Sequence, residues 1–498
     1  MTTDHAVQLD EPPRPGRSFS RRPRWGAVLA AQIAVACATG LFTLGRKSLW
    51  FDETFTFSAA HRSLSSLTSL VVHTESNMAP YNYLLHFWLP VGRSEATLRL
   101  LSVVFFVATV PLLATVVDRT FGRRTAVLAG FLLAVNPFAV VYAQELRAYS
   151  MVMCGVTAST ALFVECVLRP RRRVLVGYVV VAVLSSWAHY FALLVIVAQA
   201  VSLAWVPDLR IVLRRLRATY VALVVLSVPL LAFIADHRNT PQIDWITPLT
   251  WSGFVDVGHA FLGEGKRFPF GLLLAVALLG VAAATSMPTR DRGVRTTQQW
   301  GRALVWCWLI IPVLLTVLAC FVQNLWVARY LIVVLPAFVA LLAVGAVGLR
   351  RPALQLGAGG LVVAISVAAL AVYYPREVRF QENWRGVSTF LASPTARGHA
   401  VLFNPGYLRR GADYYPWARG LPAVDNIGID GDIAHARTAT PAEVRARLRA
   451  SPGGIAYVVQ RGNDLQPALG AFIAPAGYRQ VSVTRFGTIT VVRIEKTA

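Results

Sequence analysis

Long apolar segments recur along the whole chain, and they constrain its fold more than any other feature. Of the 498 residues, 55% are hydrophobic and only 15% are charged. A helix needs about 20 apolar residues to cross the hydrocarbon core of a bilayer, and many stretches reach that length without a charge. The sequence therefore predicts a polytopic α-helical membrane protein. The expected spans, about 11 in number, are residues 25–44, 98–117, 125–143, 149–168, 174–188, 190–206, 217–235, 269–287, 302–321, 329–348 and 354–373.

The distribution of charge predicts how these spans are oriented. The formal net charge is +23, but the basic residues stand in short clusters between apolar segments, which argues against nucleic acid as a partner. Such clusters mark the cytoplasmic side of a membrane protein. We expect a multi-pass protein of the cell membrane with a cytoplasmic N-terminus and, because the spans are odd in number, an extracytoplasmic C-terminal segment. The clusters lie at 21–24, 118–124, 169–173, 210–217, 289–295 and 350–351.

The polar segments predict the domain organisation. Residues 1–24 are rich in proline and arginine and are expected to form a disordered cytoplasmic tail, followed by a membrane domain over 25–374. Within it, residues 45–97 form a first exterior loop with two helical stretches, expected to lie at the membrane interface. Residues 375–498 are predicted to form an extracytoplasmic α/β domain. Its expected strands are 399–403, 455–460, 480–486 and 488–494, the last two joined by a tight turn at Phe486-Gly487-Thr488.

Ionisable and aromatic residues gather where spans end on the predicted exterior side. Each has an ordinary explanation as an interfacial anchor or a helix cap. Together, however, they place acids, arginines and a histidine at one depth, and ionisable groups at such a depth usually line a cavity. They are Asp52 and Glu53 after the first span, Glu145, Arg147 and Tyr149 in a short turn, His189 and Tyr190 in another, and Arg329 and Tyr330 at a span start.

Several stretches resemble a known family in their order and spacing. They are "LWFDETFTFSAA", "APYNYLLHFWL", "SEATLRLLSVVF", "NPFAVVYAQELRAYSM", "ARYLIVVLPAFVALL" and "NWRGVSTFL". These resemble the bacterial membrane glycosyltransferases of the protein-O-mannosyltransferase and aminoarabinose-transferase superfamily, which have the GT-C fold. The resemblance implies transfer of a sugar from a polyprenyl-phosphate donor on the outer side of the membrane. It also places the family's acidic pair on Asp52 and Glu53, with Asp52 as the presumed catalytic base, and its acid–arginine turn on Glu145 and Arg147.

The chemistry of the candidate residues is consistent with that function. A lipid-linked sugar phosphate is already activated, so its transfer needs one carboxylate to deprotonate the acceptor hydroxyl and cations to hold the leaving phosphate. One displacement with one base inverts the anomeric centre. We assign the base to Asp52 and an orienting or cation-binding role to Glu53. Arg147 and Arg329 are the expected phosphate ligands, because a guanidinium fork suits phosphate geometry, and Lys266 is a weaker candidate.

The sequence requires no cofactor, although Asp52 and Glu53 could together hold a divalent cation. Residues 425–432 resemble a calcium loop, but Ala436 stands where an EF-hand needs a glutamate, so that interpretation is rejected. The expected partners are the lipid-linked donor, a glycan, lipid or protein acceptor, and membrane lipids. The alternative function is a transporter or flippase of lipid-linked sugars. Such a protein should show inverted repeats or charges at span centres, and the sequence shows neither.

Overall fold

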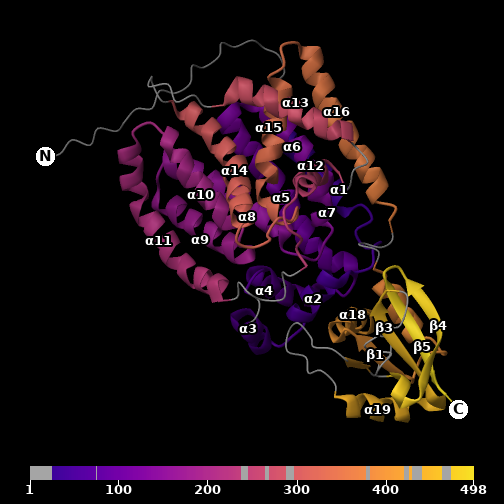
Figure 1. Cartoon of the computed structure of the whole chain (residues 1–498). Coiled ribbons are helices and arrows are strands. Elements are labelled where there is room, and N and C mark those ends of the chain that lie inside the picture. Colours follow the sequence, from indigo (N-terminus) through magenta and orange to yellow (C-terminus); the bar gives the residue numbers. More distant parts are fainter. Residues whose placement is uncertain are drawn as a thin grey trace.

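The computed structural model shows a helical bundle with a small sheet-containing unit at one end (Figure 1). It describes residues 25–73, 76–236, 245–263, 269–287, 296–376, 382–419, 426–428, 440–462 and 473–497. The predicted tail, residues 1–24, and Lys266 lie outside the described residues.

Every predicted span coincides with helical structure. Among the described residues, six helices are long and apolar enough to cross a membrane, and the bent pair α6 (Arg123–Ala134) and α7 (Pro137–Ala143) adds a seventh. The six are α5 (Glu95–Phe121), α8 (Tyr149–Leu168), α11 (Leu209–Asp236), α14 (Thr297–Ala319), η4 (Tyr330–Val334) with α15 (Leu335–Val347), and α16 (Pro352–Tyr373). The other predicted spans are the shorter helices α1 (Trp25–Leu41), α9 (Arg172–Ala188), α10 (Ala192–Ser202), which continues into η2 (Leu203–Trp205), and α13 (Pro269–Ser286). The multi-pass helical architecture is thus confirmed, whereas the total of about 11 spans stays a prediction.

The first exterior loop contains more helix than the sequence suggested. It forms three α-helices, not two: α2 (Phe51–Ala60), α3 (Leu64–His73) and α4 (Ala79–Trp88), followed by the 3-10 turn η1 (Leu89–Val91). Asp52 and Glu53 lie in the first turn of α2, which is a separate helix from α1. Negative side chains in a first turn are stabilised by the partial positive charge of the helix N-terminus. A further unpredicted helix, α12 (Trp251–Leu262), lies in the loop between α11 and α13.

The C-terminal unit, described from residue 382 onward, is built on a mixed five-stranded sheet of order β2-β1-β3-β5-β4. The strands are β1 (Ala400–Asn404), β2 (Asn426–Gly428), β3 (Ile455–Arg461), β4 (Tyr478–Phe486) and β5 (Ile489–Lys496). The first three are parallel, and β5 is antiparallel to both β3 and β4. The four predicted strands and the hairpin are therefore correct, while the three-residue β2 was missed.

Helices cover both faces of this sheet. Side chains alternate between the faces of a strand, so Leu402 of β1 packs with Val444 and Leu448 of α19 (Pro441–Ala450). Its neighbours Val401 and Phe403 belong instead to the large core that the sheet shares with the helical bundle. On that side lie α17 (Trp384–Leu391), the turn η5 (Gly406–Leu408) and α18 (Arg409–Arg419). In Figure 1, α18 lies beside α2, so the unit sits against the helix that carries Asp52 and Glu53.

Candidate active site

Asp52 faces two arginines that reach it from different parts of the chain. Its carboxylate oxygen Oδ2 lies 3.8 Å from Nη2 of Arg329 and 3.9 Å from Nη2 of Arg147. The Asp52 side chain is 19% exposed, and the two arginine side chains are 12% and 17% exposed. Charge-assisted hydrogen bonds are about 2.7–2.9 Å long, so neither arginine is bonded directly to the carboxylate. The three predicted residues therefore come together with their charged groups close but separated.

Glu53, the next residue along α2, has a different environment. It is completely buried, and its two oxygens accept hydrogen bonds at 2.7 Å from Nε and Nη2 of Arg99. The same oxygens also accept from the backbone N–H groups of Leu146, at 2.9 Å, and Trp50, at 3.3 Å. All its acceptor capacity is thus directed inward. Of the two roles predicted for Glu53, orienting the site fits this geometry.

Arg99 of α5 is one of the residues that sequence reasoning missed. It is 1% exposed, and besides Glu53 it donates to the backbone carbonyls of Leu44, Lys47 and Ser48 at 3.1, 2.8 and 3.2 Å. It therefore fixes the connection between α1 and α2 as well as the start of α2. The available signal was an arginine at the edge of the predicted span 98–117, where an ionisable residue usually has a specific partner.

The turn between α7 and α8 is attached to the same helix start. Trp50 donates from its indole Nε1 to the buried carboxylate of Glu145 at 2.9 Å, one residue before the Leu146 N–H that reaches Glu53. Arg147 then donates to Oγ1 of Thr56 at 3.1 Å, one turn along α2 from Asp52. Glu145 thus holds the turn that places Arg147 next to Asp52, and its supporting role in the site stays a prediction.

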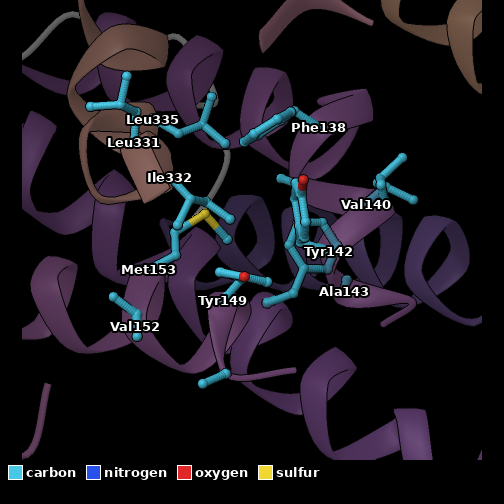
Figure 2. Close-up of a cluster of buried hydrophobic side chains, with 14 of the residues drawn as sticks. Phe138, Val140, Tyr142, Ala143, Tyr149, Val152, Met153, Leu331, Ile332 and Leu335 are labelled. Carbon is cyan, nitrogen blue, oxygen red and sulfur yellow. The ribbon is translucent and has the colours of Figure 1, made fainter. Parts of the chain in front are cut away.

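Apolar packing brings Arg329 to the same place. Tyr142 and Tyr149, at the ends of α7 and α8, lie in one buried cluster with Met153 of α8 and Leu331 and Ile332 of η4 (Figure 2). Since Arg329 immediately precedes η4, this cluster sets its position relative to the turn that carries Arg147. Arg147 and Arg329, which are far apart in the sequence, thereby reach the same carboxylate, that of Asp52.

His189, Tyr149 and Tyr330 lie around the two arginines. The His189 ring is 4.9 Å from the Tyr330 ring and 5.9 Å from the Tyr149 ring, and its Nδ1 accepts from the Phe191 N–H at 3.3 Å. Burial, together with Arg147 and Arg329, lowers the pKa of His189 to about 3, so the imidazole is neutral at physiological pH. Tyr190 instead bonds Ser76 of the first exterior loop at 2.8 Å.

Arg329 and His189 each have a buried N–H group without a hydrogen-bond partner in the part of the chain that the structure describes. These groups are Nε of Arg329 and Nε2 of His189, which carries the proton because Nδ1 is an acceptor. Buried polar groups are normally paired, and an exception calls for an explanation such as a ligand or an ordered water. Both groups flank Tyr330, the residue next to Arg329 in the chain.

A pocket of about 270 Å³ lies next to Arg329. Its lining includes Trp245, Asp256 and Trp326, together with Thr247 and Thr250. The Arg329 guanidinium carbon is 4.7 Å from the centre of the Trp245 ring, so this arginine lies between Asp52 and the pocket wall. Aromatic rings with a few polar groups are typical of small-molecule pockets.

The C-terminal unit contributes hydrogen bonds to the segment that precedes Asp52. Glu382 accepts from the Phe51 N–H at 2.7 Å, and the Tyr415 hydroxyl accepts from the Leu49 N–H at 2.9 Å. Arg385 donates to Glu95 of α5 at 2.8 Å and to the Gly45 carbonyl at 3.1 Å. None of these three residues was singled out from the sequence.

The donor set does not fit the divalent cation that the sequence left open. Asp52 already faces two guanidinium groups, and every oxygen of Glu53 is occupied by N–H donors. A cation there would be repelled by both arginines and would have to displace Arg99. The described residues contain no group of three or more His, Cys, Asp or Glu side chains that could hold a metal ion.

The bundle, the helical first exterior loop and the terminal sheet unit together define the GT-C fold of membrane glycosyltransferases, and the predicted fold class is confirmed. ArnT from Cupriavidus metallidurans in the apo state matches 94% of this chain and 97% of its own with a TM-score of 0.60 at 15% identity. The structure of the same protein bound to undecaprenyl phosphate matches 94% of this chain and 98% of its own, with a TM-score of 0.58 at 15% identity. The apo oligosaccharyltransferase of Archaeoglobus fulgidus matches 89% of this chain and 70% of its own, with a TM-score of 0.51 at 10% identity. Residues 78–234 match the family model for dolichyl-phosphate-mannose-protein mannosyltransferase. No curated protein matches the chain.

The buried pair of Glu53 and Arg99 predicts a large loss of stability in Glu53→Gln. The substitution keeps the shape but leaves the Arg99 guanidinium buried without its counter-charge, which costs about 3–5 kcal/mol. The melting temperature of the purified protein in detergent should therefore fall well below that of the unmodified chain.

Asp118→Asn is the matched control, because Asp118 pairs with Arg123 at 2.9 Å but the two side chains are 24% and 52% exposed. Such a pair contributes at most about 1 kcal/mol. Equal melting temperatures for the two variants would show that the buried pair does not stabilise the fold.

Proposed function

We propose that the protein is a membrane glycosyltransferase that moves a sugar from a polyprenyl-phosphate donor to a hydroxyl group of a cell-envelope acceptor. The observation that carries the proposal is the carboxylate of Asp52, flanked by the guanidinium groups of Arg147 and Arg329. The family model that matches residues 78–234 is named for a dolichyl-phosphate-mannose-dependent enzyme, and one matching ArnT structure contains undecaprenyl phosphate. Both names describe lipid-phosphate chemistry of this kind. The arginine clusters of the sequence support the outer side of the membrane as the place of this reaction.

The reaction proceeds by one displacement at the anomeric carbon. The acceptor oxygen forms a bond to that carbon while the bond from the carbon to the phosphate oxygen breaks. Asp52 takes the acceptor's proton, and the electron pair of the broken bond stays on the polyprenyl phosphate. Because attack and departure occur on opposite faces of the sugar, the configuration inverts. Glu53 takes no part in the chemistry, since its oxygens are already bonded to Arg99 and to backbone N–H groups.

The leaving phosphate is stabilised by donors that are already in place. Arg147 and Arg329 supply positive charge, and the unpartnered Nε–H of Arg329 and Nε2–H of His189 are two further hydrogen-bond donors for the phosphate. Preorganised donors of this kind account for much of the rate enhancement in many enzymes. The neutral state of His189 suits a hydrogen-bond donor that does not compete with Asp52 for the proton.

The pocket beside Arg329 is the proposed place of the transferred sugar. Its volume, about 270 Å³, is sufficient for one sugar ring, and its tryptophans can stack on the apolar face of such a ring. The polar side chains of Asp256 and Thr247 are suited to the hydroxyl groups at the edge of the ring. A phosphate held by Arg329 then lies between the sugar and the lipid tail.

Asp52→Asn tests the base directly. The substitution preserves the shape of the side chain and removes its basicity, so turnover should fall by about 100-fold or more. The measurement is transfer from a polyprenyl-phosphate sugar to acceptor by the purified full-length protein, with donor binding and melting temperature followed alongside. Near-normal turnover would rule out Asp52 as the base and favour a transporter of lipid-linked sugars instead.

Arg329→Ala should weaken use of the lipid donor more than use of the acceptor. The variant loses both the charge and the unpartnered N–H group, so kcat/KM for the donor should fall by roughly 100-fold, and Arg329→Lys should recover only part of it. Arg93→Ala is the control, since Arg93 is exposed and contacts the Trp417 carbonyl. Unchanged donor kinetics in Arg329→Ala would assign this residue to interfacial anchoring.

Tyr415 is proposed as a positioning residue that holds the segment before Asp52. In Tyr415→Phe the Leu49 N–H loses its acceptor, so the start of α2 loosens and kcat should fall by roughly tenfold with little change in the donor KM. Tyr414→Phe is a matched control, because the neighbouring hydroxyl donates to the Arg93 carbonyl and does not touch this segment. Equal kcat values in the two variants would contradict the positioning role.

A further inference from the structure

A second cavity lies far along the chain from Asp52, between α10 with η2 and the first part of α11. Its volume is about 660 Å³. Ala200 and Leu203 form one wall, and Leu213, Tyr220 and Val221 form the opposite wall on α11. The side chains of Arg214 and Arg217 complete the lining. The cavity is therefore lined by apolar side chains, one tyrosine and two arginines.

Beyond the cavity, α11 carries a stripe of exposed apolar residues that begins at the cavity wall. Val221, Val224 and Val228 are spaced by three and four residues, which places them on one face of the helix. They are 58%, 63% and 54% exposed in the isolated chain. Arg214 and Arg217 precede them with the same spacing on the same face. In Figure 1, α11 runs along an edge of the bundle, so this face is open to the surrounding bilayer.

The length of α11 places its basic end at the level of the lipid headgroups. The helix has 28 residues and is thus about 42 Å long, whereas the hydrocarbon core of a bilayer is about 30 Å thick. Its first turns, which carry the arginines, must extend beyond the hydrocarbon. Neither Arg214 nor Arg217 has a carboxylate partner among the residues that the structure describes.

Tyr220 adds an independent observation. Its hydroxyl is buried and has no hydrogen-bond partner within the described ranges, while the Tyr220 side chain is part of the cavity lining. A buried hydroxyl without a partner is costly. An ester or phosphate oxygen of a lipid in the cavity would satisfy it once the Tyr220 side chain turns toward the cavity, because the hydroxyl is enclosed in the structure described.

We propose that this cavity is a binding site for an anionic phospholipid. The phosphate lies between the Arg214 and Arg217 guanidinium groups, a lipid oxygen accepts from Tyr220, and one acyl chain follows Val221, Val224 and Val228. Basic pockets between transmembrane helices bind anionic headgroups because charge and desolvated apolar surface act together. The site is distinct from the one around Asp52, and its test does not depend on the catalytic activity.

The test is native mass spectrometry of the full-length protein in detergent, with phosphatidylglycerol or phosphatidylcholine of identical acyl chains added at equal concentration. The unmodified protein should retain phosphatidylglycerol preferentially. The double variant Arg214→Gln/Arg217→Gln should lower the bound fraction by about tenfold, since it removes both cationic partners of the lipid phosphate. Tyr220→Phe, which removes only the hydroxyl, should lower it severalfold without a change in charge.

The matched control is Arg350→Gln/Arg351→Gln, which removes two exposed arginines of the loop between α15 and α16 and leaves the cavity intact. It should retain phosphatidylglycerol like the unmodified protein. If both double variants lost bound phosphatidylglycerol to the same extent, the net charge of the protein would explain the binding and the proposal would be overturned. Equal retention of phosphatidylcholine, or displacement of phosphatidylglycerol by millimolar inorganic phosphate, would also overturn it.

Discussion

The buried ion pair between Glu53 and Arg99 is the interaction on which the organisation of the site depends. Arg99 uses its remaining N–H groups to hold the carbonyls of the connection between α1 and α2, and Glu53 uses its remaining acceptor capacity to hold Trp50 and the turn before α8. Removing a charged pair from water carries a large penalty, which is offset only when every donor and acceptor is satisfied. Here the pair joins three segments at one point, so its geometry determines where α2 begins.

That fixed start gives two adjacent carboxylates different tasks. Neighbouring residues on a helix point about 100° apart, so when Glu53 faces Arg99 in the core, Asp52 must face Arg147 and Arg329. The Glu53 carboxylate is saturated with hydrogen bonds. Among the described residues, the Asp52 carboxylate faces two guanidinium groups that lie 3.8 and 3.9 Å away. A base of this kind must be held rigidly but keep its oxygens free for the substrate, and the division of roles between the two acids achieves both.

The C-terminal unit extends this support from outside the helical bundle. Glu382 and Tyr415 accept the backbone N–H groups of Phe51 and Leu49, and Arg385 reaches both the preceding connection and Glu95 of α5. The segment leading to Asp52 is therefore held between α5 on one side and the C-terminal unit on the other. The C-terminal unit, which follows the membrane helices in the sequence, thus helps to hold the backbone next to Asp52.

The sequence by itself determined the features that local pattern encodes. Apolar length predicted the helical segments, alternation predicted four strands and their hairpin, and the position of ionisable residues at span ends predicted that Asp52, Arg147 and Arg329 would meet. It did not indicate that Glu53 is saturated by Arg99, that Glu382 and Tyr415 support the site, that the first exterior loop holds three helices, or that α12 and β2 exist. The reason is that these contacts join residues 46, 331 and 366 positions apart, and their strength comes from burial. Burial is created only when the helices and the sheet pack together, so only the tertiary structure could separate the acid that holds the site from the acid that faces the substrate.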